Sequence, residues 1–201
     1  AGCGRSSVLE GLALDLAGAP YTETLIKLGQ PDTRALILQH SATGKVPLLQ
    51  TEHGTIADSL AIAEYLNERF PAAQMWPADT AARAQARSAC AQMHSDFFGL
   101  RSNLPFDLSR DRALVPMPAE AQADIDRMTA LWAQCRAVAT EPGPYLFGRL
   151  SLADAFFAPV AVRLRTYRVA LSAEDEAYID AIYQWPAFKA WQQAGLEEVQ
   201  G

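Results

Sequence analysis
The spacing of apolar residues changes about a third of the way along the chain. Before residue 71, short segments of strand character alternate with helical ones, whereas after residue 78 the apolar residues recur only at helical steps. A chain of 201 residues is long enough for both parts to bury a core. The pattern therefore predicts a small α/β domain over residues 1–71, a linker over 72–78 and an all-helical domain over 79–201.

The expected elements follow from this spacing and from capping residues. In the first part they are a helix over 6–17, a strand over 21–28, a short helical segment after Pro31-Asp32, strands over 46–50 and 54–56, and a helix capped by Asp58. In the second part they are helices over about 79–104, 119–140, 152–168, 173–183 and 186–194. Met75 and Trp76 form an apolar pair in the linker, so we expect it to be ordered and docked between the domains.

Charge and cysteine content exclude several classes of function. The chain has 17 Lys and Arg against 23 Asp and Glu, a net charge of −6, and its one basic group, Arg163, Arg165 and Arg168, is best explained as a solvated helix end. No apolar run approaches the roughly 18 residues needed to cross a bilayer. The three cysteines are odd in number and lack metal-ligand spacing. We therefore expect a cytoplasmic protein without a metal that binds neither nucleic acid nor membrane.

Three short motifs carry the candidate chemistry. At Val46-Pro47 a cis bond would turn the Val46 backbone outward to pair with an extended ligand, although an edge-strand proline explains the motif equally well. Asp58-Ser59 opens a helix whose backbone N–H groups form a site for a carboxylate, although capping by Asp58 is the simpler explanation. Ser151-Leu152-Ala153-Asp154 is a capping box and is structural in every interpretation.

The order and spacing of these motifs resemble the cytosolic glutathione S-transferase family over essentially the whole chain. Asp58-Ser-Leu-Ala-Ile-Ala-Glu-Tyr-Leu and Ser151-Leu-Ala-Asp-Ala-Phe-Phe-Ala-Pro, with Met93-His94-Ser95 and Leu100-Arg101, look like a bacterial branch near the zeta class. The resemblance implies a thioredoxin-like first domain of order βαβαββα, packed on an all-helical second domain. It also implies a glutathione site in the first domain, an apolar pocket between the domains, and a homodimer that pairs across the first domain and the 79–104 helix.

The resemblance assigns glutathione contacts one position at a time. The Val46 backbone, before Pro47, would pair with the cysteinyl unit of glutathione. Ser59 would hold the γ-glutamyl carboxylate and Asp58 its ammonium group. Lys45 would contact the glycyl carboxylate, or be a solvated lysine. Two residues earlier in the chain, Gln39 and His40, would make further contacts with glutathione.

The start of the chain departs from the family. The family opens with a strand in the middle of its sheet, which Ala1-Gly2 cannot supply, so we expect the printed sequence to lack a few residues at its start. Gly4-Arg5 stands where this branch has a catalytic Ser pair, and a shift of one or two residues recruits Cys3, Ser6 or Ser7 instead. Ser6 and Ser7 would either hold the glutathione sulfur as a thiolate or cap the first helix.

Cys3 supports a separate hypothesis. Cys3-Gly4-Arg5-Ser6 has the Cys-x-x-Ser form of monothiol redox sites. A cysteine ahead of a helix N-terminus has a lowered pKa and forms a mixed disulfide with glutathione. A non-reactive cysteine near a chain end is the alternative.

Candidate residues for the second substrate lie in the helical part. Cys90, His94, Phe97 or Phe98, and Arg101 recur at three- and four-residue steps and are expected to share one helix face. His94 and Arg101 on an apolar face would bind an acidic electrophile, or serve as a core histidine and a domain-bridging ion-pair partner. Further aromatic residues are the pocket-wall candidate Tyr167 and the expected core residues Trp132, Trp185 and Trp191.

Several functions are compatible with these residues. The resemblance implies a glutathione transferase whose thiolate attacks a small electrophile. A zeta-like isomerase uses the same thiolate, although the Ser-Ser-Cys signature of that class is missing. A thiol–disulfide oxidoreductase built on Cys3 is also compatible with the sequence, and so is a non-catalytic glutathione-binding or scaffold protein.

Overall fold

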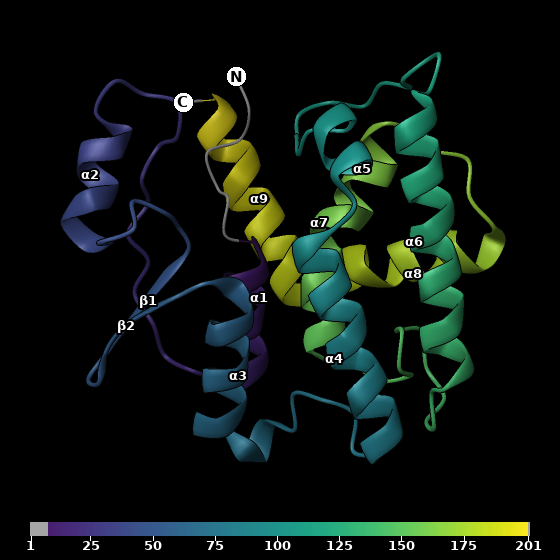
Figure 1. Ribbon diagram of the computed structural model, residues 1–201, viewed down its shortest axis with the longest axis horizontal. Helices are drawn as coiled ribbons and strands as arrows, with labels where there is room; N and C mark the ends of the chain where they lie inside the picture. The colour runs from purple at the N-terminus through teal and green to yellow at the C-terminus, as the bar shows by residue number, and fades with distance from the viewer. Residues whose placement is uncertain (1–7, 201) are drawn as a thin grey trace.

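Helix α1 (Val8–Ala17) opens the part of the chain that the computed structural model describes, residues 8–200. Its core face recurs at helical spacing, and it ends at Gly18, whose φ of +63° suits a residue without a side chain. Helix α2 (Thr33–His40), strands β1 (Leu48–Thr51) and β2 (Gly54–Ala57), and helix α3 (Ser59–Arg69) follow. Figure 1 shows α2 and the β1–β2 hairpin at one side of the molecule, with α1 beside α3.

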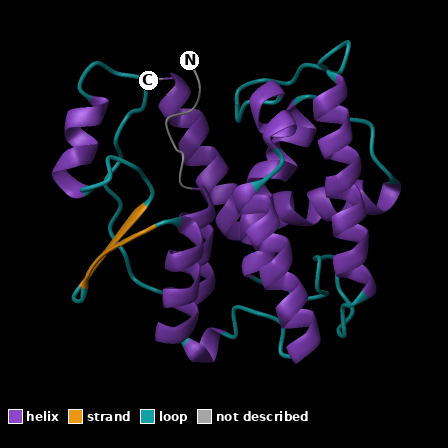
Figure 2. Cartoon of the chain, in the orientation of Figure 1, coloured by secondary structure: helices purple, strands orange, loops and turns teal. Residues whose placement is uncertain are grey.

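Every further element of the described chain is helical apart from two isolated bridges. After the short 3₁₀ turn η1 (Pro71–Ala73) come α4 (Thr80–Ser95), α5 (Phe98–Asn103), α6 (Ala119–Ala137), α7 (Leu152–Thr166), α8 (Ala173–Gln184) and α9 (Pro186–Gln200). Figure 2 shows this contrast between a small hairpin and a helical body. The predicted order of an α/β part followed by an all-helical part is confirmed. None of the helices within residues 8–200 is long and apolar enough to cross a membrane.

The predicted strand over 21–28 is wrong. In the described residues the sheet has two strands only, β1 and β2, paired antiparallel with Leu48 opposite Ala57 and Thr51 opposite Gly54. Residues 19–27 run as an extended loop, and Tyr21 remains 49% exposed. The segment has the β-branched and aromatic residues of a strand, but these residues stabilise a strand only when a neighbouring strand pairs with it.

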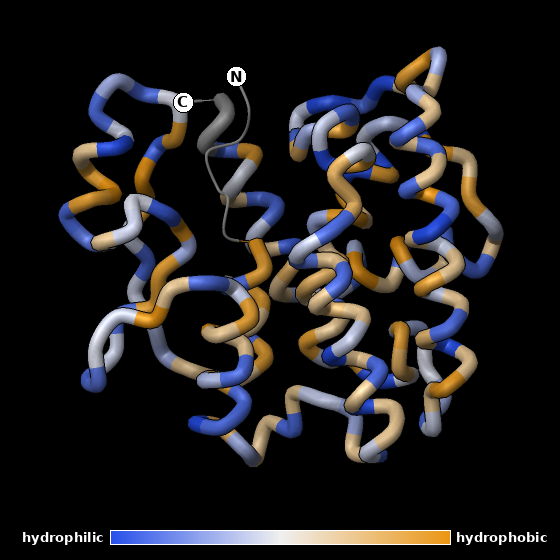
Figure 3. The backbone as a smooth tube through the Cα atoms, viewed as in Figure 1, coloured by the Kyte–Doolittle hydropathy of each residue, from blue (hydrophilic) through white to orange (hydrophobic). Residues whose placement is uncertain are grey.

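Helix α7 is the centre of the helical part. It packs against α1, α4 and α8, and nearly all its residues are buried. Its N-terminus carries the predicted capping box, in which Ser151 and Asp154 bond each other's backbone. The predicted core tryptophans are buried, and Trp132 meets Phe157 and Tyr178 edge to face. Figure 3 shows hydrophobic and hydrophilic residues alternating along the helices, as this packing requires.

The linker is docked, as the Met75-Trp76 pair predicts. Both side chains are buried. The Leu152 N–H donates to the Met75 carbonyl at 2.8 Å, and the Arg149 guanidinium donates to the Gln74 and Trp76 carbonyls at 2.6 and 2.7 Å. These bonds join the linker to the start of α7.

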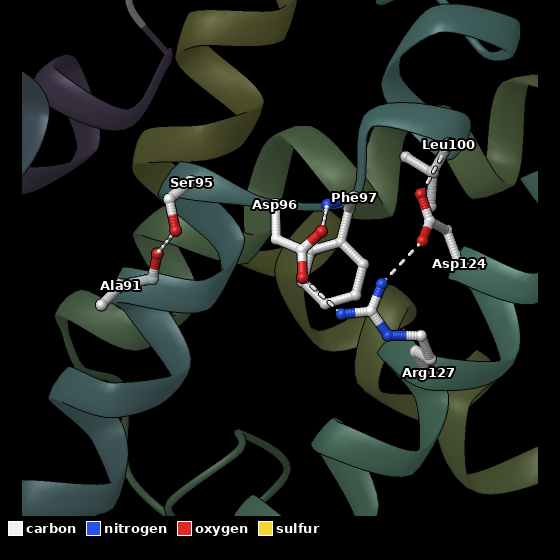
Figure 4. A network of polar contacts seen from close by, with 7 residues as sticks. All are labelled: Ala91, Ser95, Asp96, Phe97, Leu100, Asp124 and Arg127. Atoms are coloured by element: carbon white, nitrogen blue, oxygen red, sulfur yellow. Dashed lines mark hydrogen bonds and ion pairs between the residues drawn. The ribbon is translucent and has the colours of Figure 1, made fainter.

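The predicted continuous helix over 79–104 is interrupted at Asp96-Phe97. Phe97 has a left-handed backbone, with φ +61° and ψ +40°, and its N–H donates to the Asp96 carboxylate at 2.7 Å. Arg127 from α6 pairs with Asp96 and lies over the Phe97 ring, as Figure 4 shows. Asp124 accepts from the Leu100 N–H at 3.1 Å. This network bends the chain, so the residues before and after the break do not share one helix face.

Candidate functional site
A cavity of about 760 Å³ lies in the N-terminal part of the molecule. It is bounded by α1, the extended loop over 19–26, β1 and the second half of α3. Most of its lining is apolar, and its polar side chains include one buried acid, Glu10. Such a cavity is large enough to take a small-molecule ligand.

Val46 and Pro47 line this cavity, directly before β1. The peptide bond between them is cis, as the ligand-pairing interpretation of this motif requires. Among the other sequence candidates, His40 also lines the cavity, and its Nδ1 lies 3.4 Å from Nε2 of Gln50. Gln39 and Lys45 do not line it.

Asp58 and Ser59 lie at the N-terminus of α3. Asp58 caps the helix, as predicted, with its Oδ1 accepting from the Leu60 N–H at 2.8 Å. Its φ of +81° is rare for a residue with a side chain. Its second oxygen, Oδ2, lies 2.9 Å from Nε2 of His94 on α4. Both Asp58 oxygens therefore already have a partner.

His94 and Arg101 form a bridge between α3, α4 and α5. Arg101 donates to the His94 carbonyl at 3.2 Å, and His94 in turn meets Asp58. His94 is half-buried and is the residue that joins the N-terminus of α3 to α4, whereas this contact of Arg101 is with a backbone carbonyl of α4. The contacts thus differ from the alternatives of a core histidine for His94 and a domain-bridging ion pair for Arg101. The sequence could not reveal this pairing, because 36 residues separate Asp58 from His94.

The remaining second-substrate candidates lie away from the cavity. Phe97 and Cys90 are buried in the core, and burial raises the pKa of the Cys90 thiol well above its usual value. Tyr167 is also buried, and its hydroxyl donates to the Pro105 carbonyl at 3.2 Å. Phe98, in contrast, is exposed. The break at Asp96-Phe97 separates these residues, so the expectation of one shared helix face is wrong.

The candidate thiolate-stabilising residues lie outside the described residues. They are Cys3, Ser6 and Ser7, together with the departing pair Gly4-Arg5. Within residues 8–200, no group of three or more His, Cys, Asp or Glu side chains is arranged to hold a metal ion.

Glu10 is a polar residue that the sequence reasoning missed. It lies in the first turn of α1, is 7% exposed and lines the cavity. Burial raises the pKa of its carboxyl, a hydrogen bond from Ser59 lowers it, and the charge of Asp58 raises it. The available signal was its position, because Glu10 precedes Ala13, Leu14 and Ala17 by the steps of the buried face.

The buried carboxyl of Glu10 makes stability depend on pH. Because its pKa is raised in the folded chain, its favourable contribution is present below the unfolded pKa and is lost as pH rises through the folded one. We expect Glu10→Gln to melt at a higher temperature than the wild type at pH 8, with a smaller difference at pH 5. Thermal unfolding of both proteins across this range measures the effect, and a difference independent of pH would contradict it.

Residues 11–69 match the model of the glutathione S-transferase N-terminal domain. The maleylacetoacetate isomerase of Pseudomonas aeruginosa is 28% identical over 177 residues, covering 84% of this chain and 81% of that protein. A holo structure of a maleylpyruvate isomerase, described as a bacterial zeta-class glutathione S-transferase, is 26% identical with a TM-score of 0.67 and covers 91% of this chain and 90% of that one.

A glutathione transferase homologue from Burkholderia gl BGR1, solved with bound glutathione, is 23% identical with a TM-score of 0.70. The match covers 98% of this chain and 95% of that one. The described structure thus has the architecture of a thioredoxin-like domain joined to a helical domain.

Proposed function
Because the chain belongs to the glutathione S-transferase family, in a bacterial branch near the zeta class, we propose that it is an enzyme that binds glutathione and directs its thiolate at a small electrophile. One observation carries this proposal. Within the N-terminal part of the chain, Val46, Pro47 and His40 line one cavity of about 760 Å³, whereas Asp58 and Ser59 lie at the N-terminus of α3 and are not among the residues that line it. The proposal therefore rests on a cavity of ligand size beside the cis Val46-Pro47 bond, in a chain that resembles glutathione transferases.

In this proposal each of the three units of glutathione has its own contacts with the protein. The Val46 backbone pairs with the cysteinyl unit, and Ser59 with the positive end of α3 holds the γ-glutamyl carboxylate. Lys45 binds the glycyl carboxylate of glutathione. Hydrogen bonds to a charged group are stronger than neutral ones, so the carboxylate at Ser59 contributes much of the binding free energy.

The chemistry proceeds through the sulfur of glutathione. The thiol loses its proton, the thiolate forms a bond to an electrophilic carbon, and the leaving group departs with the displaced electron pair. Binding near the N-terminus of α1 would favour the thiolate over the thiol, because the helix end carries partial positive charge. Ser6, Ser7 and Cys3 remain the candidates for direct contact with the sulfur.

An isomerase is the second candidate, since the two relatives described above that exceed 25% identity are isomerases by name. The same thiolate would add to a conjugated double bond, allow rotation and then leave. Assays of maleylacetoacetate and maleylpyruvate isomerisation beside conjugation of a model electrophile distinguish the two activities. The missing Ser-Ser-Cys signature favours the transferase.

We also propose the bounds of the two domains, the cellular location of the protein and its oligomeric state. Residues 1–71 form the glutathione-binding domain, 72–78 the linker and 79–201 the domain that supplies the electrophile pocket. The family resemblance supports a cytoplasmic homodimer.

Replacing Ser59 by Ala tests the glutathione site. Losing the hydroxyl bond to a charged carboxylate is expected to weaken glutathione binding by about 1.5–3 kcal/mol, which is more than tenfold in Kd. Calorimetric titration of glutathione into wild type and variant measures it. Ser88→Ala removes an exposed serine of α4 and is expected to bind like the wild type. A wild type that binds no glutathione would overturn the proposal.

A further inference from the structure
Asp58 has an unusual backbone conformation for a residue with a side chain. Its φ of +81° and ψ of 134° lie outside the regions that such residues ordinarily occupy. A conformation of this kind is unfavourable by itself and persists only where the surrounding contacts hold it. Because Asp58 stands directly before Ser59, the first residue of α3, the same contacts also fix where the chain enters the helix.

Two contacts hold the Asp58 carboxylate. Within α3, the Leu60 N–H donates to its Oδ1 at 2.8 Å. From α4, Nε2 of His94 lies 2.9 Å from its Oδ2. The first contact is an ordinary helix cap, which depends only on neighbouring residues. The second contact exists only when the helical part of the chain is packed against α3, so His94 connects the two parts at this point.

His94 is itself held in position. It lies in the last turn of α4, and its carbonyl accepts from Nη1 of Arg101 at 3.2 Å. About two turns earlier in α4, the Arg87 guanidinium donates to both carboxylate oxygens of Glu64 on α3, at 2.8 and 3.0 Å. α3 and α4 are neighbours in Figure 1, and these two polar contacts fix the position of one helix along the other.

The pair of Asp58 and His94 remains accessible to a ligand. The Asp58 side chain is 49% exposed and the His94 side chain 34%. An ionised carboxylate has room for about four hydrogen bonds, so each oxygen of Asp58 can accept from one more donor. The contact with His94 requires only an N–H at Nε2, which imidazole carries in one neutral tautomer and in its protonated form. The Asp58 carboxylate is therefore fixed but not fully occupied.

We infer that His94 is a positioning residue of the proposed glutathione site and acts through Asp58. In that site Asp58 binds the ammonium of the γ-glutamyl unit, as the family resemblance implies, and Ser59 binds its carboxylate. His94 holds Oδ2 in place, so the Asp58 side chain loses less conformational freedom when the ammonium binds. The inference rests on the proposed function and adds a residue of the helical domain to a site in the N-terminal domain.

The experiment compares glutathione with an analogue that lacks only the ammonium. The analogue is glutaryl-cysteinyl-glycine, in which a hydrogen replaces the γ-glutamyl amino group. Calorimetry gives the Kd of both ligands for wild type, His94→Ala, His94→Gln and the control Arg87→Ala. His94→Gln keeps an N–H of similar reach that can donate to Asp58. Arg87→Ala is the matched control, because it removes the other polar contact between α3 and α4 without touching Asp58. Thermal melting verifies that each variant is folded.

The expected result is a change in the ratio of the two Kd values. Wild type is expected to bind glutathione about ten- to a hundredfold more tightly than the analogue, because the missing contact joins two charged groups. His94→Ala is expected to reduce this ratio about fivefold, the effect of one hydrogen bond, and to leave the Kd of the analogue nearly unchanged. His94→Gln restores most of the ratio. Arg87→Ala keeps the wild-type ratio, even where its melting temperature is lower.

Several results would overturn the inference. An unchanged ratio in His94→Ala removes His94 from the site, and a larger ratio shows that its contact competes with the ammonium for Asp58. An equal decrease in Arg87→Ala, or no recovery in His94→Gln, assigns the effect to helix packing rather than to the contact with Asp58. Equal binding of both ligands by the wild type removes the ammonium contact but leaves the glutathione site intact. A wild type that binds neither ligand overturns the proposed function together with this inference.

Discussion
Replacing Asp154 by Ala is expected to lower the free energy of unfolding by about 3–5 kcal/mol, because it leaves buried donors without an acceptor. The carboxylate is fully buried. It accepts from the Ser151 N–H at 2.8 Å, the Leu146 N–H at 3.2 Å and the Ser151 hydroxyl at 3.2 Å. Each backbone N–H left unpaired in the interior costs about 1–3 kcal/mol.

Urea unfolding measures the effect, with Asp79→Ala as the matched control. Asp79 also accepts from a helical N–H, that of Ala82 at 2.8 Å, but it is exposed and its loss is expected to cost about 1 kcal/mol. Equal losses for the two variants would show that burial of the Asp154 network contributes nothing beyond ordinary capping.

Replacing Gly148 by Ala is expected to cost about 3–4 kcal/mol of unfolding free energy, from backbone strain and a steric clash. Gly148 has φ +84°, and a Cβ there would lie 1.9 Å from the Glu141 carbonyl oxygen. The clash is with backbone, which a side-chain rotation cannot relieve. The turn matters beyond itself, because neighbouring Arg149 holds the linker and Leu146 bonds Asp154.

Gly29→Ala separates the two sources of this cost. Gly29 also has a positive φ, +76°, but nothing in the described residues lies within 4 Å of its added Cβ. It is expected to lose only about 1 kcal/mol in the same urea experiment. If Gly148→Ala lowers the free energy of unfolding no more than Gly29→Ala does, the close approach of the Glu141 backbone to Gly148 does not contribute to stability.

Whether a helix or strand could be predicted from the sequence depends on how far apart in the chain the residues lie that stabilise it. The helices after residue 104 and the capping box at Ser151 were predicted correctly, because helical spacing and capping act over three or four residues. The strand over 21–28 was not, because a strand needs a partner that its own residues do not encode. The helix break at Asp96-Phe97 depends on Arg127, which lies 31 residues away from Asp96 in the chain.

In the candidate site, too, local features could be predicted from the sequence and contacts between distant residues could not. The sequence motifs located the cis Val46-Pro47 bond and the Asp58 cap, and their order was sufficient to recognise the family. They did not show that Asp58 meets His94 or that Glu10 is buried.

The sequence by itself therefore determined most of the helices, their caps, the two-part architecture and the family, since each is expressed in local spacing and residue type. Only the tertiary structure decided which side chains meet across α3 and α4, and which acids are buried. The physical reason is that such contacts form between residues distant in the chain, and their free energy depends on burial and charge that exist only after packing.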